Sequence, residues 1–76
     1  MQKHIIEYDT SLDALISVTK RLSKYENRYN MMSEVFFDNY QKGLMEDEIE
    51  FVEWSNDYQH YLEIRLSVER KLQNVA

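Results

Sequence analysis

The chain has 76 residues, a net charge of −5 and no cysteine. A chain of this length forms one small domain that buries only about 60% of its unfolded surface, and without cysteine it can form neither a disulfide nor a thiolate metal site. The negative charge disfavours non-specific nucleic-acid binding, and no apolar run approaches the roughly 20 residues that cross a bilayer. We therefore expect stability to come from oligomerisation or from a partner.

Residues 1–10 are predicted to form an N-terminal arm, followed by a single helical domain over residues 11–76. The segment lacks the apolar core of a signal peptide, so we expect a cytoplasmic protein. A short strand over His4–Tyr8 is the alternative, and such a strand would need another chain to pair with.

The absence of proline and the single glycine favour long helices. The first helix is predicted from Ser11 to Tyr29, with Thr10 or Ser11 accepting the free N–H groups of its first turn. Asn30 is predicted to end this helix, because asparagine tolerates the left-handed conformation. The helix is recognised by apolar residues that recur three and four positions apart, which are Leu15, Val18, Leu22, Tyr25 and Tyr29.

A short second helix is predicted from Glu34 to Lys42, capped by Ser33 and ended by Gly43. The third helix is predicted from Asp47 to Leu72, with an apolar seam at the same three-four spacing. The seam consists of Phe51, Trp54, Tyr58, Tyr61, Arg65, Val68 and Leu72.

The two long helices differ in predicted length. At 1.5 Å per residue the third helix is about 39 Å long and the first about 28 Å. If the two pack antiparallel, the end of the third helix extends past the first. Leu66, Val68 and Leu72 would then lack an intrachain partner, which favours a second subunit or another protein over this end.

An acidic stripe lies on the third helix, where four carboxylates follow one another at spacings of four, three and four. In an antiparallel arrangement this stripe can pair with a basic stripe near the end of the first helix, or it can meet a basic cleft on a partner. The acidic residues are Glu46, Glu50, Glu53 and Asp57, and the basic residues are Lys20, Arg21, Lys24 and Arg28.

The aromatic residues divide into two groups. Tyr61 and His60 lie further along the third helix and are candidates for an interface, where rings with one polar end are enriched. The others are predicted to form the core, and they are Phe36, Phe37, Phe51, Trp54 and Tyr58.

The sequence indicates no catalytic site, metal or cofactor. It has no cysteine nucleophile, no G-x-S-x-G turn and no glycine-rich phosphate loop. Glu53, Asp57 and His60 could face one way, but the facing helix offers no matching ligands. The basic stripe, with Tyr25 and Tyr29 among it, could in principle contact nucleic acid, and the net charge disfavours this.

Part of the chain resembles a group of small prokaryotic proteins, mostly uncharacterised, many of which are similar to the antitoxin halves of toxin–antitoxin gene pairs. Their pattern is close to K-Y-G-M-S-S-E-E-F-Y, a glycine, and D-F-F-E-W-S followed by tyrosines. The matching residues cover roughly the last two-thirds of the chain and comprise Arg28–Phe37, Gly43, Asp47, Phe51–Ser55 and Tyr58. The chain departs from the pattern at Asn30, Met32, Val35 and Phe37, where the group has Gly, Ser, Glu and Tyr.

Residues and resemblance together predict an all-α fold: a helical hairpin of two long helices with a short middle helix, dimerising into a helix bundle. The resemblance implies a partner-binding antitoxin that neutralises a cognate toxin, a ribonuclease, by covering its active site. The alternative is a self-associating structural protein without a toxin partner. The predicted partner-binding residues are Glu50, Glu53, Asp57, His60, Tyr61, Arg65, Val68 and Leu72.

Overall fold

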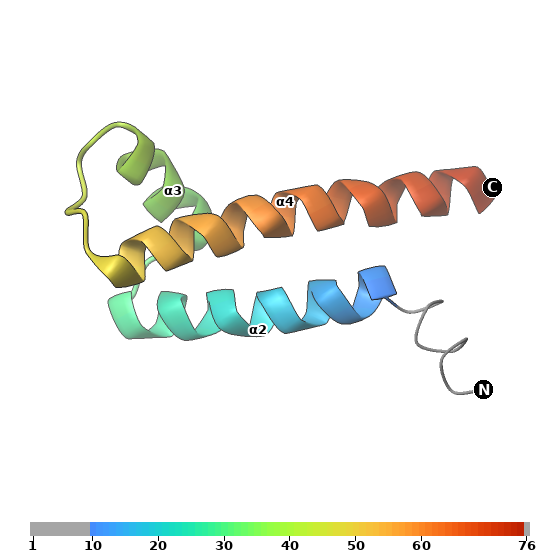
Figure 1. The fold of residues 1–76 in the computed structure, drawn as a ribbon, viewed down its shortest axis with the longest axis horizontal. Helices are drawn as coiled ribbons and strands as arrows, with labels where there is room; N and C mark the ends of the chain where they lie inside the picture. Colours follow the sequence, from blue (N-terminus) through green and yellow to red (C-terminus); the bar gives the residue numbers. More distant parts are fainter. Residues whose placement is uncertain (1–9, 76) are drawn as a thin grey trace.

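The computed structural model describes residues 10–75, and three α-helices make up most of this part (Figure 1). Helix α2 spans Thr10–Tyr29, α3 spans Ser33–Gln41 and α4 spans Ile49–Val75. The predicted all-α class is thereby confirmed for the described residues. The arm predicted for residues 1–10 lies outside them, except for Thr10, at which α2 begins.

The long helices α2 and α4 lie side by side and run in opposite directions, and α3 packs near the end at which α4 begins (Figure 1). Contacts between the long helices follow this order, since Tyr29 near the end of α2 contacts Glu50 and Ser11 near its start contacts Lys71. Because α3 has only 9 residues, it covers one end of this pair and leaves the other end as a layer of two helices.

Two residues in the left-handed conformation separate the helices. Asn30 follows α2 directly with φ 57°, and Gly43 follows the end of α3 with φ 77°. Both stops are those predicted from the sequence, because glycine and asparagine adopt positive φ most readily. The Gly43 N–H donates to the Tyr40 carbonyl at 3.1 Å, which satisfies one of the last carbonyls of α3.

Ser33 is not the cap of α3 that the sequence predicts. Met32 occupies the cap position without a side-chain hydrogen bond, and Ser33 is the first helical residue. The Ser33 hydroxyl accepts a hydrogen bond from the Trp54 indole N–H at 3.0 Å, and its backbone N–H donates to Glu26 Oε2 at 3.0 Å. Ser33 therefore ties the start of α3 to both long helices.

Helix α4 begins at Ile49 and ends at Val75, whereas the sequence predicts Asp47 and Leu72. Asp47 stays in the preceding loop, where its Oδ1 accepts a hydrogen bond from the Tyr40 hydroxyl at 2.9 Å. The carboxylate thus holds the loop to α3, so the helix starts after it.

Trp54 lies at the centre of the core and is fully buried. The Phe36 ring stacks on it with centroids 3.8 Å apart and planes 4° apart, and Tyr25 and Tyr29 stack on it from α2 at 5.4 and 5.6 Å. Such aromatic pairs contribute roughly 0.5–1.5 kcal/mol each beyond their burial. One tryptophan therefore joins all three helices.

The predicted aromatic core is confirmed at its centre. Phe36, Phe51 and Trp54 are buried, while Phe37 and Tyr58 are partly buried and pack against them. The rings of Phe37 and Tyr58 contact each other, with centroids 5.1 Å apart, and so they cover the edge of the core between α3 and α4.

The far end of α4 extends less beyond α2 than the sequence predicts. The Lys71 ammonium lies 2.9 Å from the Ser11 hydroxyl, so α2 accompanies α4 almost to Leu72. Val68 is half-buried rather than exposed, while Leu66 and Leu72 are 53% and 66% exposed. The predicted apolar exposure at this end is therefore found for Leu66 and Leu72.

Candidate partner-binding surfaces

Two of the predicted partner-binding residues, Glu50 and Asp57, lie in the seam between α2 and α4. Arg21 Nε lies 3.2 Å from Asp57 Oδ1, and Arg28 Nη1 lies 3.3 Å from Glu50 Oε2. The arginine side chains are largely exposed, so each ion pair contributes only about 0–1 kcal/mol. Of the two interpretations of the acidic stripe, pairing within the chain is the one found at these two positions.

Two tyrosines of α2 donate hydrogen bonds to the same two carboxylates. The Tyr25 hydroxyl donates to Asp57 Oδ2 at 3.2 Å, and the Tyr29 hydroxyl donates to Glu50 Oε1. Burial, followed by the negative charge of Asp57, raises the pKa of Tyr25 to about 12. The hydrogen bond to Glu50, followed by burial, raises the pKa of Tyr29. Both phenols therefore keep their protons to a higher pH than an ordinary tyrosine and act as hydrogen-bond donors.

An open hollow of about 240 Å³ lies beside the start of α3, between the two long helices. Tyr61 and Arg65, two more of the predicted residues, line it. Arg65 Nε lies 3.4 Å from Glu69 Oε2, and the guanidinium carbon lies 6.0 Å from the centroid of the Tyr61 ring. The rest of the lining carries both hydroxyl and carboxyl groups and consists of Thr19, Leu22, Glu26, Met32, Ser33, Glu34 and Tyr58.

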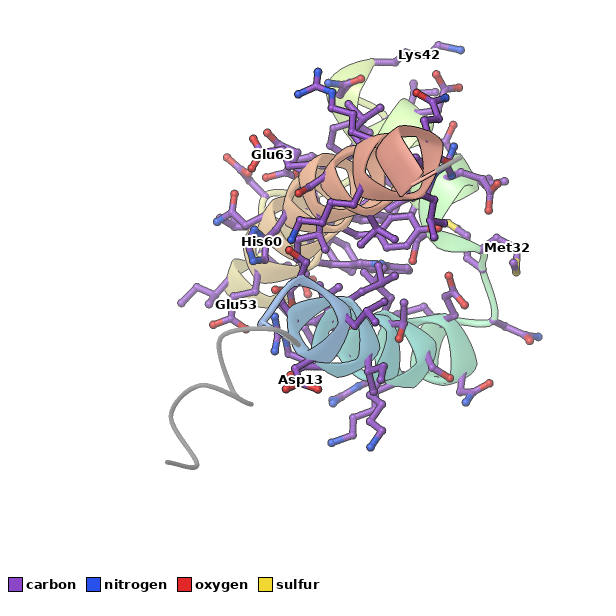
Figure 2. All side chains as sticks on the ribbon, turned by 90° about the vertical axis from the view of Figure 1, so that its right-hand side faces the viewer. Asp13, Met32, Lys42, Glu53, His60 and Glu63 are labelled. Carbon is purple, nitrogen blue, oxygen red and sulfur yellow. The ribbon has the colours of Figure 1, made fainter. Side chains whose placement is uncertain are left out.

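Glu53 and His60 lie elsewhere. Figure 2 shows both on one side of the molecule, with Met32, which lines the hollow, on the other. Both side chains are exposed, as is that of Glu63 on the same side. The structure thus divides the predicted set between the seam, the hollow and this outer side of α4, with Val68 and Leu72 near the helix end.

A further surface is formed by the loop between α3 and α4 and the first residues of α4, at residues 43–53, here named the corner; the sequence predicts a role for its carboxylates Glu46, Glu50 and Glu53 but not for its exposed apolar residues. It carries Leu44 and Ile49, which are 69% and 78% exposed and are the two most exposed large apolar side chains of the described residues. Helical spacing identifies the buried side of a helix, so it does not draw attention to these positions. In the sequence, the feature that marks this surface is an acidic run at residues 46–48 with an apolar residue near each end.

No protein family, curated protein or solved structure matches the chain. Among residues 10–75, no helix has both the length and the apolar character needed to cross a membrane. The described residues also contain no group of three or more His, Cys, Asp or Glu that could hold a metal ion. A proposal for the function therefore has to rest on the geometry of these surfaces and on the sequence resemblance described above.

Proposed function

We propose that this protein is an antitoxin-like partner-binding module, which neutralises a cognate toxin with ribonuclease activity by covering its active site. The observation that carries the proposal is the distribution of large apolar side chains. Among the residues that the structure describes, six hydrophobic residues are buried in the core, while nine large ones are exposed. A small domain with more such residues exposed than buried gains free energy when a partner covers them.

The charge of the chain supports a basic partner. The net charge is −5, and a ribonuclease active site must attract the phosphates of RNA, so its surface is positive. Opposite charges on two surfaces steer their association and disfavour wrong partners. An acidic protein with exposed apolar side chains is therefore suited to cover such an active site.

Four of the residues predicted to bind the partner are exposed and so are accessible to it: Glu53, His60, Arg65 and Leu72. Glu50 and Asp57 already contact arginines of α2. We infer that their main role is to hold the two long helices together, and that the contact with the toxin uses carboxylates outside the seam.

Co-expression with the product of the neighbouring gene tests this proposal. We expect that product to arrest growth when expressed alone, and the pair to grow normally and to co-purify. A Trp54→Ala variant, which removes the centre of the core, should fail to rescue growth and serves as the negative control. A pair that neither co-purifies nor relieves toxicity contradicts the proposal.

Self-association is a second candidate function, and the end of the molecule not covered by α3 favours it. Leu12 and Ile16 of α2 and Leu66 of α4 are 51%, 53% and 53% exposed. Two such helix pairs, packed face to face, would form a four-helix bundle. In this case the hairpin of α2 and α4 dimerises.

Sedimentation of the isolated chain over a range of concentrations tests the second candidate. A dimer that Ile16→Lys and Leu66→Lys together convert to a monomer would support it. A wild-type chain that sediments as a monomer at every concentration contradicts it and leaves the first proposal standing.

A further inference from the structure

The corner between α3 and α4 is held in place by contacts on both sides of its exposed residues. The Leu44 N–H donates to the Asn39 carbonyl at 2.9 Å, and Met45 packs against the buried core. Asp47 accepts the hydrogen bond from Tyr40 at 2.9 Å. The loop is therefore ordered before any partner arrives, which lowers the entropic cost of binding through it.

This ordered segment presents apolar side chains to solvent. Leu44 is 69% exposed and Ile49 is 78% exposed. Val52, 39% exposed, lies three residues after Ile49 and so on the same side of α4. None of the three belongs to the core cluster that Trp54, Phe51 and the side chains packed on them form, so Leu44 and Ile49 contribute little to the stability of the isolated fold.

The same segment concentrates negative charge. Glu46, Asp47 and Glu48 are consecutive and exposed. A hydrogen bond with Glu46, followed by burial and by the charges of Glu46 and Glu50, raises the pKa of Glu48, as expected where carboxyl groups crowd together. The nearby Lys42 ammonium pairs with Asp38 at 2.9 Å. A positively charged side chain of a partner would reduce the repulsion between these carboxylates.

We propose that the corner is a docking surface for a basic protein, whose apolar pocket receives Leu44 and Ile49 and whose Lys or Arg side chains pair with Glu46 and Glu48. This inference rests on the proposed function and names the surface that meets the toxin. A second copy of this chain would not suit the corner, because a symmetric contact would bring two acidic surfaces together.

Two double variants and two matched controls test the docking surface with the co-expressed product of the neighbouring gene. Leu44→Ser with Ile49→Ser removes the apolar contact, and Glu46→Lys with Glu48→Lys reverses the charge. The apolar control is Met32→Ser with Val35→Ser at the start of α3, two exposed side chains that neither proposed interface uses. The charge control is Asp13→Lys with Glu63→Lys, two exposed carboxylates in the first turn of α2 and in the middle of α4, outside the corner. All eight positions are exposed, so circular dichroism should show wild-type helix content in every variant.

The affinity for the purified toxin and the rescue of growth are then compared. We expect each corner variant to bind at least about tenfold more weakly and to rescue poorly, as truncation of central interface residues does, while both controls match the wild type. Controls that fail equally, or corner variants that bind like the wild type while the wild type still neutralises, overturn the docking surface alone. A wild-type chain that does not neutralise overturns the proposed function, and the docking surface with it. If the chain forms a homodimer that the corner variants disrupt, then a second copy of the chain, and not a basic partner, binds the corner.

Discussion

The Trp54 indole N–H donates a hydrogen bond to the Ser33 hydroxyl at 3.0 Å, and both residues are almost completely buried. Ser33→Ala leaves this donor without an acceptor, so we expect a loss of about 1–3 kcal/mol in the free energy of unfolding, measured by urea denaturation. Ser23→Ala, at an exposed position of α2, is the control and should change stability by less than about 0.5 kcal/mol. Equal stability of the two variants would show that the buried hydrogen bond contributes nothing.

Phe36 is fully buried and stacks on Trp54, at 3.8 Å between ring centroids. Phe36→Ala leaves a cavity in the cluster that joins all three helices, and such substitutions cost about 3–5 kcal/mol. We expect the helical circular dichroism signal to fall at room temperature, because a domain of this size has little stability to spare. Leu44→Ala, at an exposed site, should keep the signal, and a folded Phe36→Ala chain would argue against this core.

Asn30 and Gly43 differ from other loop residues in their positive φ, 57° and 77°. Asn30→Gly should leave the melting temperature unchanged or raise it, whereas Asn30→Ala should cost about 1 kcal/mol. Gly43→Ala should cost about 1–2 kcal/mol from φ alone, because an added Cβ at this position meets nothing within 4 Å. Thermal melts of the three variants check this, and an Asn30→Ala chain as stable as Asn30→Gly would contradict it.

Tyr25 makes the fold sensitive to alkaline pH. Its pKa is raised from 10.0 to about 12, first by burial and then by Asp57. Because the folded state holds the proton more tightly, the stabilisation is complete below pH 10 and is lost as the pH rises through about 12. We expect Tyr25→Phe to show a smaller loss of stability than the wild type over this range in denaturant titrations. Parallel curves for the two proteins would mean that Tyr25 titrates normally.

Asp57 connects that titration to the ion pair with Arg21. Asp57→Asn removes the negative charge but leaves burial in place, so the pKa of Tyr25 should fall and remain above its ordinary value. The ultraviolet absorbance of tyrosinate follows this change, with Asp57→Asn compared to Glu63→Gln as an exposed control. Stability at neutral pH should change little, since the Arg21 side chain is 47% exposed and such pairs contribute about 0–1 kcal/mol.

The features of the fold that the sequence predicts are those set by local chemistry. Asn30 and Gly43 mark the helix ends because few residues tolerate positive φ. Phe51 and Trp54 are recognised as core because three-four spacing places them on one side of a helix. The role of Ser33 could not be predicted in the same way, since its hydroxyl accepts a hydrogen bond from Trp54, which lies 21 residues away in the chain.

The candidate surfaces were harder to predict. Spacing along α4 places Glu53 and Asp57 together, and only the position of Arg21 shows that Asp57 is engaged inside the molecule. Leu44 and Ile49 carry no periodic signal, because their exposure depends on where the loop leaves α3 and where α4 begins. The contact surface of a helical protein therefore depends on tertiary packing that one sequence does not specify.

The claim that the corner binds the partner can be tested by hydrogen exchange of the chain, free and in complex with the co-purified product of the neighbouring gene. Partner binding through the corner predicts slower exchange of the backbone amides of residues 43–53 in the complex. The first turns of α2 and the last turns of α4 should exchange as they do in the free chain. Protection confined to those turns, with the corner unchanged, would contradict the claim.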